Sequence, residues 1–100
     1  MKNKELLKEE KSPCTVDGRL IFKEVKKTEL LTLEYRVYEA SEGKAPYSIE
    51  VIATNGTNRK NAILMGAFDL CEEAKRFFEL ISRNFVTPVS LSYIYEDYCE

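Results

Sequence analysis

The sequence predicts an α+β fold: an antiparallel sheet of three to five strands, a hairpin plus a meander, covered on one face by two C-terminal α-helices. Up to about residue 68, short runs alternate apolar and polar residues, as strands with one buried face do. From residue 69 onward, apolar residues recur three or four positions apart, as on amphipathic helices. Because the strands come first and the helices last, we expect both helices to cover one face of an antiparallel sheet.

The chain begins with a segment that we expect to be flexible. Residues 1–12 are rich in Lys and Glu, and only Leu6 and Leu7 could attach them to a core. Residues 13–100 are expected to form a single α+β domain, since a chain of 100 residues builds one core. Asp17-Gly18 stands between two short apolar runs and favours the two-residue turn of a β-hairpin.

Three further runs predict the meander. LLTLEYRVYE (30–39) and YSIEVIAT (47–54) alternate, and the second is expected to turn Ser48 and Glu50 toward water. AILMGAFD (62–69) follows a polar loop at 55–61 and is expected to pair with its predecessor, with Gly66 at a bulge or close to a helix. The residues expected to face the core are Leu31, Leu33, Tyr35, Val37, Tyr47, Ile49, Val51 and Ala53.

The first helix is predicted to begin near residue 70. Asp69 and Glu72 resemble a capping box, and Asn84 is expected to end the helix in the left-handed conformation. The apolar positions at helical spacing are Leu70, Ala74, Phe77, Phe78 and Ile81.

A second short helix is predicted at the C-terminus. Thr87 followed by Pro88 is typical of an N-cap with proline in the first turn. Leu91, Ile94, Tyr95 and Tyr98 then recur at helical spacing, so most of this segment is expected to belong to the core.

Composition excludes several classes of function. The net charge is −2 and the bases are interspersed with acids, so we expect no nucleic-acid partner. No apolar run approaches the 18 or more residues of a membrane span, and we expect no membrane partner. Histidine is absent, which removes Ser-His and Cys-His catalysis. The four scattered glycines form no phosphate-binding loop, and no cofactor is predicted.

The three cysteines, Cys14, Cys71 and Cys99, are odd in number and irregularly spaced. This pattern suits neither a disulfide framework nor a zinc site, and it favours reduced thiols in the cytoplasm. Cys71 is placed near the start of the first helix and is the more activated of the two helical cysteines, but it has no His partner.

The C-terminal residues form a candidate partner surface. Tyr93 lies off the apolar stripe of the last helix, and Tyr side chains are common at interfaces. Glu96, Asp97 and Glu100 carry oxygen ligands suited to hard cations, but no loop with EF-hand spacing exists, so hydrated carboxylates are expected and no metal. The candidate partner surface is therefore Tyr93, Glu96, Asp97 and Glu100, and no catalytic residue is predicted.

The segment from Tyr35 to Tyr98 resembles a family of short uncharacterised Firmicutes proteins, mostly clostridial, that is described as a domain of unknown function. The matching stretches are YSIEV, ISRN and above all VTPVSLSYIYEDY, which is similar to the family's Val-Ser-Pro-Val-His-Leu pattern with its Val-Val-Glu-Asp-Phe-like ending. The motif positions are Pro88, Leu91, Ile94, Glu96, Asp97 and Tyr98. The resemblance implies no activity, and Ser90 stands where the family carries His.

Two hypotheses of function follow. The first is a small cytoplasmic binding or regulatory module that acts through protein–protein contacts, with a protein partner or as a homodimer, through a sheet edge or the Tyr93 side of the last helix. The second is a small enzyme or ligand-binding protein that uses Cys71 or the C-terminal carboxylates. The absence of histidine favours the first over an enzyme.

Overall fold

The structure is a computed structural model, which describes residues 18–99. The predictions of a flexible segment at 1–12 and of a first hairpin arm before Asp17 lie outside the described residues. The elements are β1 (Arg19–Lys27), β2 (Thr32–Glu39), β3 (Tyr47–Asn55), β4 (Asn58–Phe68), α1 (Cys71–Arg83), the 3₁₀ turn η1 (Pro88–Ser90) and α2 (Leu91–Cys99).

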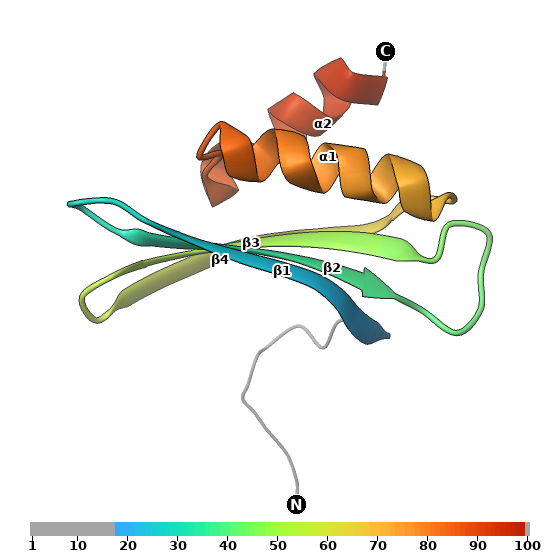
Figure 1. Cartoon of the computed structure of the whole chain (residues 1–100), viewed down its shortest axis with the longest axis horizontal. Helices are drawn as coiled ribbons and strands as arrows, with labels where there is room; N and C mark the ends of the chain where they lie inside the picture. Colours follow the sequence, from blue (N-terminus) through green and yellow to red (C-terminus); the bar gives the residue numbers. More distant parts are fainter. Residues whose placement is uncertain (1–17, 100) are drawn as a thin grey trace, which may run out of the picture.

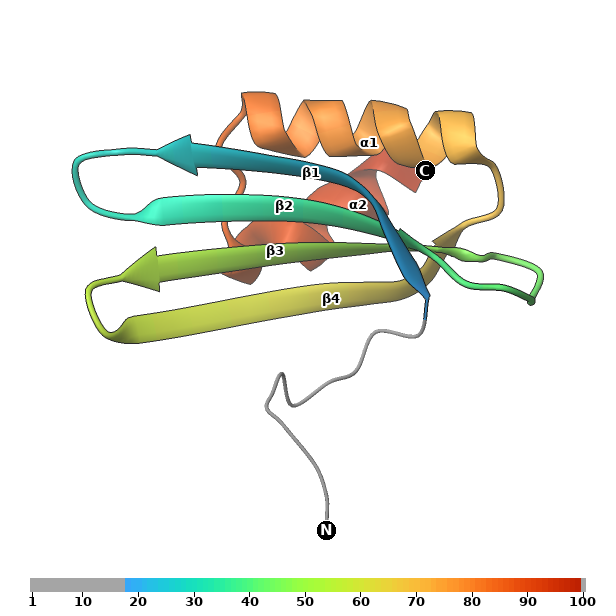
Figure 2. The same ribbon diagram turned by 60° about the horizontal axis from the view of Figure 1, so that its bottom comes forward.

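The four strands form one antiparallel sheet in the order β1-β2-β3-β4 (Figure 2). Both helices lie on the same face of this sheet, and no helix of residues 18–99 lies on the opposite face (Figure 1). The predicted fold class is therefore confirmed, with four strands. No helix of the described part of the chain is long and apolar enough to cross a membrane.

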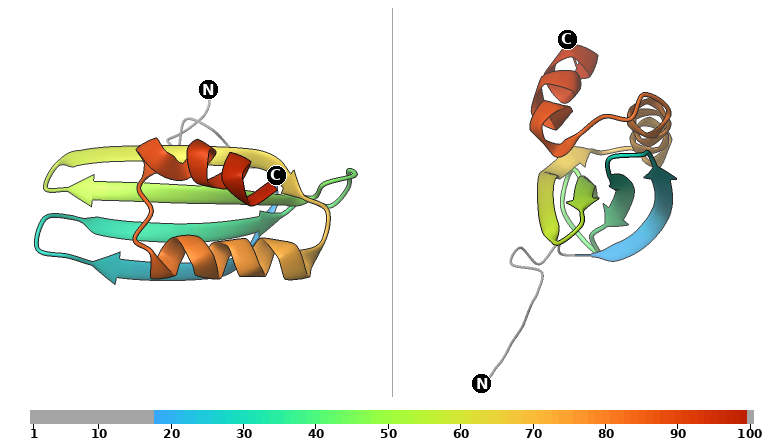
Figure 3. Two further views of the ribbon diagram at one scale, coloured as in Figure 1. Left: turned by 90° about the horizontal axis from the view of Figure 1, so that it is seen from above. Right: turned by 90° about the vertical axis from the view of Figure 1, so that its left-hand side faces the viewer.

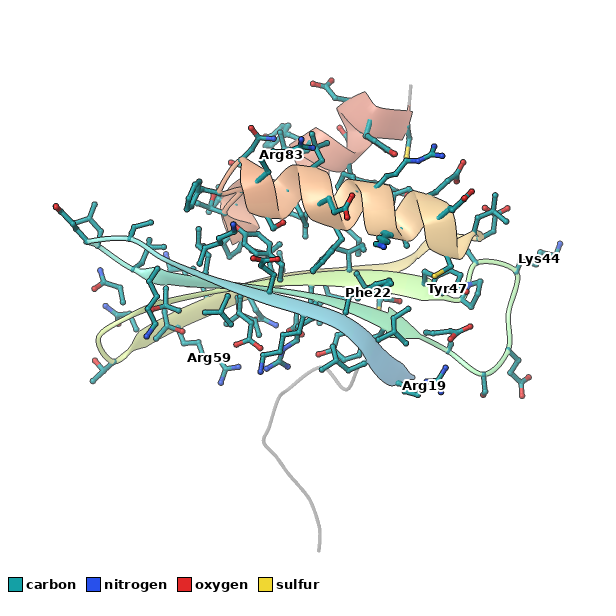
Figure 4. All side chains as sticks on the ribbon, viewed as in Figure 1. Arg19, Phe22, Lys44, Tyr47, Arg59 and Arg83 are labelled. Carbon is teal, nitrogen blue, oxygen red and sulfur yellow. The ribbon has the colours of Figure 1, made fainter. Side chains whose placement is uncertain are left out.

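The predicted loop at 55–61 is too long, because β4 already begins at Asn58. Asn55 pairs with Asn58 across a turn of two residues, Gly56 and Thr57. Gly56 has φ 62°, a left-handed value that suits glycine at the first position of a hairpin turn. The polar residues Arg59 to Asn61 therefore belong to the edge strand, with Arg59 on the face without helices (Figure 4).

The core lies between the sheet and the helices. Side chains of β2 and β3 alternate between the two faces of the sheet. The residues of these strands that were predicted to face the core do lie on the side of α1. Phe22 of β1 also points to this side and stacks on Phe78 of α1 at 5.8 Å between ring centroids (Figure 4). The buried core residues are Leu33, Tyr35, Val37, Ile49, Val51, Phe68, Ala74, Phe77, Phe78, Ile81, Val86 and Leu91.

The start of α1 differs from the prediction. The N-cap is Leu70, with extended φ and ψ and no side-chain cap hydrogen bond, so the capping box at Asp69 and Glu72 is wrong. The first helical bond runs from the amide of Ala74 to the carbonyl of Leu70, which places Asp69 one residue too early to cap the helix.

The end of α1 also differs by one residue. Asn84 has φ −99°, and it is Phe85 that adopts the left-handed φ of 53°. The amide of Val86 donates to the carbonyl of Ile81 at 3.0 Å, and that of Phe85 to Ser82 at 3.4 Å, which is a Schellman motif. The Asn84 side chain instead donates to the carbonyl of Leu80 at 2.8 Å, so it satisfies the helix end without a left-handed backbone.

The prediction that Ser48 and Glu50 point to water is also wrong. Both lie on the face without helices, as their register requires, but each is only 4% exposed. Side chains of the flanking strands close over β3: the hydroxyl of Tyr38 donates to Glu50 at 2.9 Å, and the amide of Asn61 donates to its second oxygen at 2.9 Å. Burial of Glu50 is thus produced by cross-strand neighbours, not by a covering helix.

Candidate functional site

The outward side of η1 and α2 brings the candidate partner residues together. Tyr93 is 70% exposed, and Glu96 and Asp97, three and four positions later, lie on the same side of the helix and are also exposed. Glu100 lies outside the described residues. Val89, 74% exposed, stands four positions before Tyr93, and the sequence interpretation missed it although this spacing marks it. We call Val89, Tyr93, Glu96 and Asp97 the α2 surface.

The α2 surface is held in place from beneath. Thr87 and Pro88 stand at the N-cap and first position, as predicted, but of the 3₁₀ turn η1, and Thr87 makes no side-chain cap hydrogen bond. Leu91 is buried against the sheet. The hydroxyl of Tyr95 donates a 2.6 Å hydrogen bond to the carbonyl of Ala67 at the end of β4. This bond and Leu91 fix which side of α2 faces outward.

Aromatic side chains complete this attachment. The rings of Tyr95 and Tyr98 meet those of Phe68 and Phe77 edge to face, at centroid distances of 5.2 to 5.9 Å. The prediction that Tyr95 and Tyr98 pack on the core is therefore confirmed, although Tyr98 keeps 38% of its surface exposed. Burial raises the pKa of Tyr95, and the neighbouring thiol of Cys99 adds to the rise.

A groove separates α1 from α2. The two helices stand apart above the sheet, α1 over β1 and β2 and α2 over β3 and β4 (Figure 3). One part of the groove is a cavity of about 300 Å³ lined mainly by apolar residues. Its lining residues are Leu80, Asn84, Val86, Ile94, Asp97 and Tyr98.

A second cavity, of about 470 Å³, continues past Tyr98 toward the start of α1. Tyr98 lines both cavities, so they adjoin on either side of its ring, which packs against Phe77 of α1. We call the two adjoining cavities the groove, with an apolar half and an acidic half. The residues of the second cavity that carry charge, an aromatic ring or a thiol are Lys44, Phe68, Asp69, Glu73, Tyr98 and Cys99.

The charges along the groove are mostly acidic. Asp69, Glu73 and Asp97 line the two cavities, against the single base Lys44. From residue 84 to 99 the sequence contains no Lys or Arg at all. The groove therefore combines an apolar half with an acidic half, and the exposed ring of Tyr98 stands between them.

Cys71 is separate from this groove. It is exposed at the first residue of α1, whereas the thiol that lines the second cavity is that of Cys99. Tyr47 lies beside Cys71 and donates a hydrogen bond to Glu39 at 3.1 Å. Burial raises the pKa of Tyr47, and Glu39 and Cys71 add to the rise. Within residues 18–99 no three acidic or Cys side chains stand close enough to hold a metal ion.

A polar network on the face without helices was also missed from the sequence. Tyr38 accepts a 3.0 Å hydrogen bond from Arg36 and donates to Glu50, and burial is the main cause that raises the pKa of this tyrosine. The hydroxyl of Tyr38 and both carboxylate oxygens of Glu50 have partners within the sheet, so we assign this network a structural role.

Comparison with known proteins gives one match. No curated protein and no solved structure matches the chain. One family model, described as a family of unknown function (DUF6514), matches residues 3–100 and so covers nearly the whole sequence. The protein therefore belongs to the DUF6514 family.

Proposed function

We propose that this protein is a small binding module that acts through protein–protein contacts made by the α2 surface. The observation that carries the proposal is the exposure of Val89 in η1 and Tyr93 in α2, 74% and 70%, in a segment that is anchored in the core by Leu91. Apolar and tyrosine side chains held rigidly in water are typical of binding surfaces, since little conformational entropy is lost when a partner covers them.

The size of the α2 surface favours a partner that also enters a concave site. Two exposed side chains of this kind cover about 300 Å². A stable interface usually buries about 800 Å² on each partner. A homodimer would therefore need a further area, such as the exposed edge of β1 or β4. A partner that extends from the α2 surface into the neighbouring groove gains area without a second surface.

The proposal is tested by capture with matched variants. Tyr93→Ala and Val89→Ala remove the exposed apolar groups, and Leu30→Ala is the control, because Leu30 is 77% exposed at the β1–β2 turn. A partner retained by the parent protein and by Leu30→Ala, but lost from both α2 variants, supports the proposal. Light scattering on the same samples shows whether the partner is a second copy. The proposal is contradicted if the protein is strictly monomeric and its captured partners are retained equally by the parent protein and by all three variants.

A second candidate function is a small enzyme or ligand-binding protein that uses Cys71 or the C-terminal carboxylates. One observation favours it: Cys71 is exposed, and a tyrosine hydroxyl bonded to Glu39 lies beside it. Alkylation by iodoacetamide tests this, with Cys99 as the internal comparison. If iodoacetamide modifies both thiols slowly and at equal rates, Cys71 has no special reactivity, and this second function is contradicted.

We further propose a cytoplasmic setting in a Firmicutes cell. Two exposed cysteines, Cys71 and Cys99, are free thiols in the described part of the chain, which suits a reducing compartment. The Firmicutes origin rests on the resemblance of the VTPVSLSYIYEDY stretch.

A further inference from the structure

We infer that the groove between α1 and α2 binds a basic amphipathic helix of a partner protein. The inference rests on the proposed function, and it adds the chemistry and the binding mode of the partner. Three properties of the groove carry it: its apolar half, its acidic half and its length.

The apolar half provides an anchor site. Leu80 on α1 and Ile94 on α2 face the cavity of about 300 Å³ from opposite sides, and Val86 lies in the connection between the helices. Apolar grooves between two helices accept the apolar side of a third helix, which inserts side chains spaced three or four residues apart. An isoleucine, leucine or phenylalanine of the partner would fill this half.

The acidic half selects the charge of the partner. Asp69 and Glu73 line the second cavity, and none of the salt bridges formed within residues 18–99 involves either carboxylate. Asp97 adds a third carboxylate at the rim of the apolar half. A Lys or Arg of the partner would meet these carboxylates, and it would also lie near the ring of Tyr98, where a cation is attracted to the aromatic face.

The length of the groove suits a short helix. Glu73 marks one end on α1 and Asn84 the other. Asn84, the C-cap, follows Glu73 by eleven positions, which corresponds to about 16 Å, or three helical turns. A partner helix of that length would place an apolar anchor in one half and a base in the other, and its outer turn would reach Tyr93. An anionic membrane is disfavoured as the occupant because the lining carboxylates would repel it.

Peptide selection tests this inference directly. A phage-displayed library of random peptides about 16 residues long, or about four helical turns, is panned against the full chain. Two variants are panned in parallel: Asp97→Lys changes the groove, and Glu79→Lys makes the same charge change on the exposed side of α1, where it lines neither cavity.

We expect enriched peptides with apolar residues at i and i+4 and at least one Lys or Arg. A synthesised consensus peptide should bind the Asp97→Lys variant about tenfold more weakly than the parent protein. The Glu79→Lys variant should bind this peptide with the affinity of the parent protein. NMR shifts should concentrate at Leu80, Ile94 and Tyr98. No enrichment above background, an acidic consensus, or equal binding by the two variants would overturn the inference.

The outcomes separate the two proposals. If partner capture depends on Tyr93 and Val89 but the library yields no basic consensus, the groove inference fails and the proposed function stands. If groove-binding peptides are found but Tyr93→Ala and Val89→Ala retain the captured partners as the parent protein does, the proposed use of the α2 surface fails.

Discussion

The hydroxyl of Tyr35 in β2 donates a 2.9 Å hydrogen bond to the carbonyl of Val86, 51 residues later in the chain. Val86 is the residue at which the chain leaves the Schellman motif of α1 and turns toward η1. The ring of Tyr35 is fully buried, and its hydroxyl satisfies a carbonyl that no strand or helix pairs. This bond therefore joins the centre of the sheet to the connection that positions α2, and it fixes one wall of the groove.

The first prediction concerns this bond. Tyr35→Phe keeps the ring but leaves the carbonyl of Val86 without its donor, and we expect a loss of about 1–2 kcal/mol in the free energy of unfolding. Tyr93→Phe is the control, because Tyr93 is 70% exposed and its loss should stay within about 0.5 kcal/mol. Urea unfolding at neutral pH measures both. Equal effects of the two changes would show that the bond contributes nothing.

The second prediction is a loss of stability at alkaline pH. Burial raises the pKa of Tyr35 to about 12, from 10.0 in the unfolded chain. Above pH 10 the unfolded chain releases the proton while the folded protein keeps it, so stability present below pH 10 is lost as the pH rises toward 12. The loss from this one group amounts to about 2–3 kcal/mol.

The Tyr35→Phe variant isolates that contribution. Tyr38, Tyr47 and Tyr95 also have raised pKa values, but they are present in both proteins. The stability difference between the parent and Tyr35→Phe should therefore shrink as the pH is raised through 10 and 11. A difference that stays constant, measured by urea unfolding at each pH, would show that Tyr35 titrates alike in the folded and unfolded states.

Residues with a strict local period could be predicted from the sequence. The inward rows of β2 and β3 follow from alternation, because side chains of a strand point to opposite faces regardless of what lies beyond them. Thr87-Pro88 marked the start of the last helical segment because capping depends on neighbouring residues only. The exposure of Tyr93 followed from the same local spacing, since it falls outside the apolar stripe.

Features that depend on distant residues could not be predicted. Glu50 is buried because Tyr38 and Asn61 reach over it from the two flanking strands, and no local pattern contains that contact. The groove depends on how far α1 stands from α2, which the whole core determines. The left-handed residue is Phe85 and not Asn84 because the side-chain bond of Asn84 to Leu80 and the Val86–Ile81 bond shift the helix end.

The third prediction concerns the buried carboxylate of Glu50. Glu50→Ala removes the acceptor of Tyr38 and Asn61, and it removes the more distant of the two carboxylates paired with Arg36, 3.8 Å away, while Glu34 remains. We expect a loss of about 2 kcal/mol, because the half-buried hydroxyl of Tyr38 loses its acceptor. Glu79→Ala, at an exposed position of α1, should be nearly neutral. In a double-mutant cycle, Glu50→Ala and Tyr38→Phe should couple by more than about 0.5 kcal/mol, and strict additivity would contradict the network.

The last prediction concerns the segment that carries the α2 surface. Deletion of residues 89–99 with the C-terminal residue removes Leu91, which is 1% exposed, and uncovers Phe68 and Phe77. We expect this deletion to abolish cooperative thermal unfolding, because two core rings lose their cover. Leu91→Ala is the finer test, with an expected loss of about 2–4 kcal/mol. Val89→Ala, in the same segment but 74% exposed, should leave the transition unchanged. A truncated chain that unfolds at the parent temperature would show that α2 is an appendage and not part of the core.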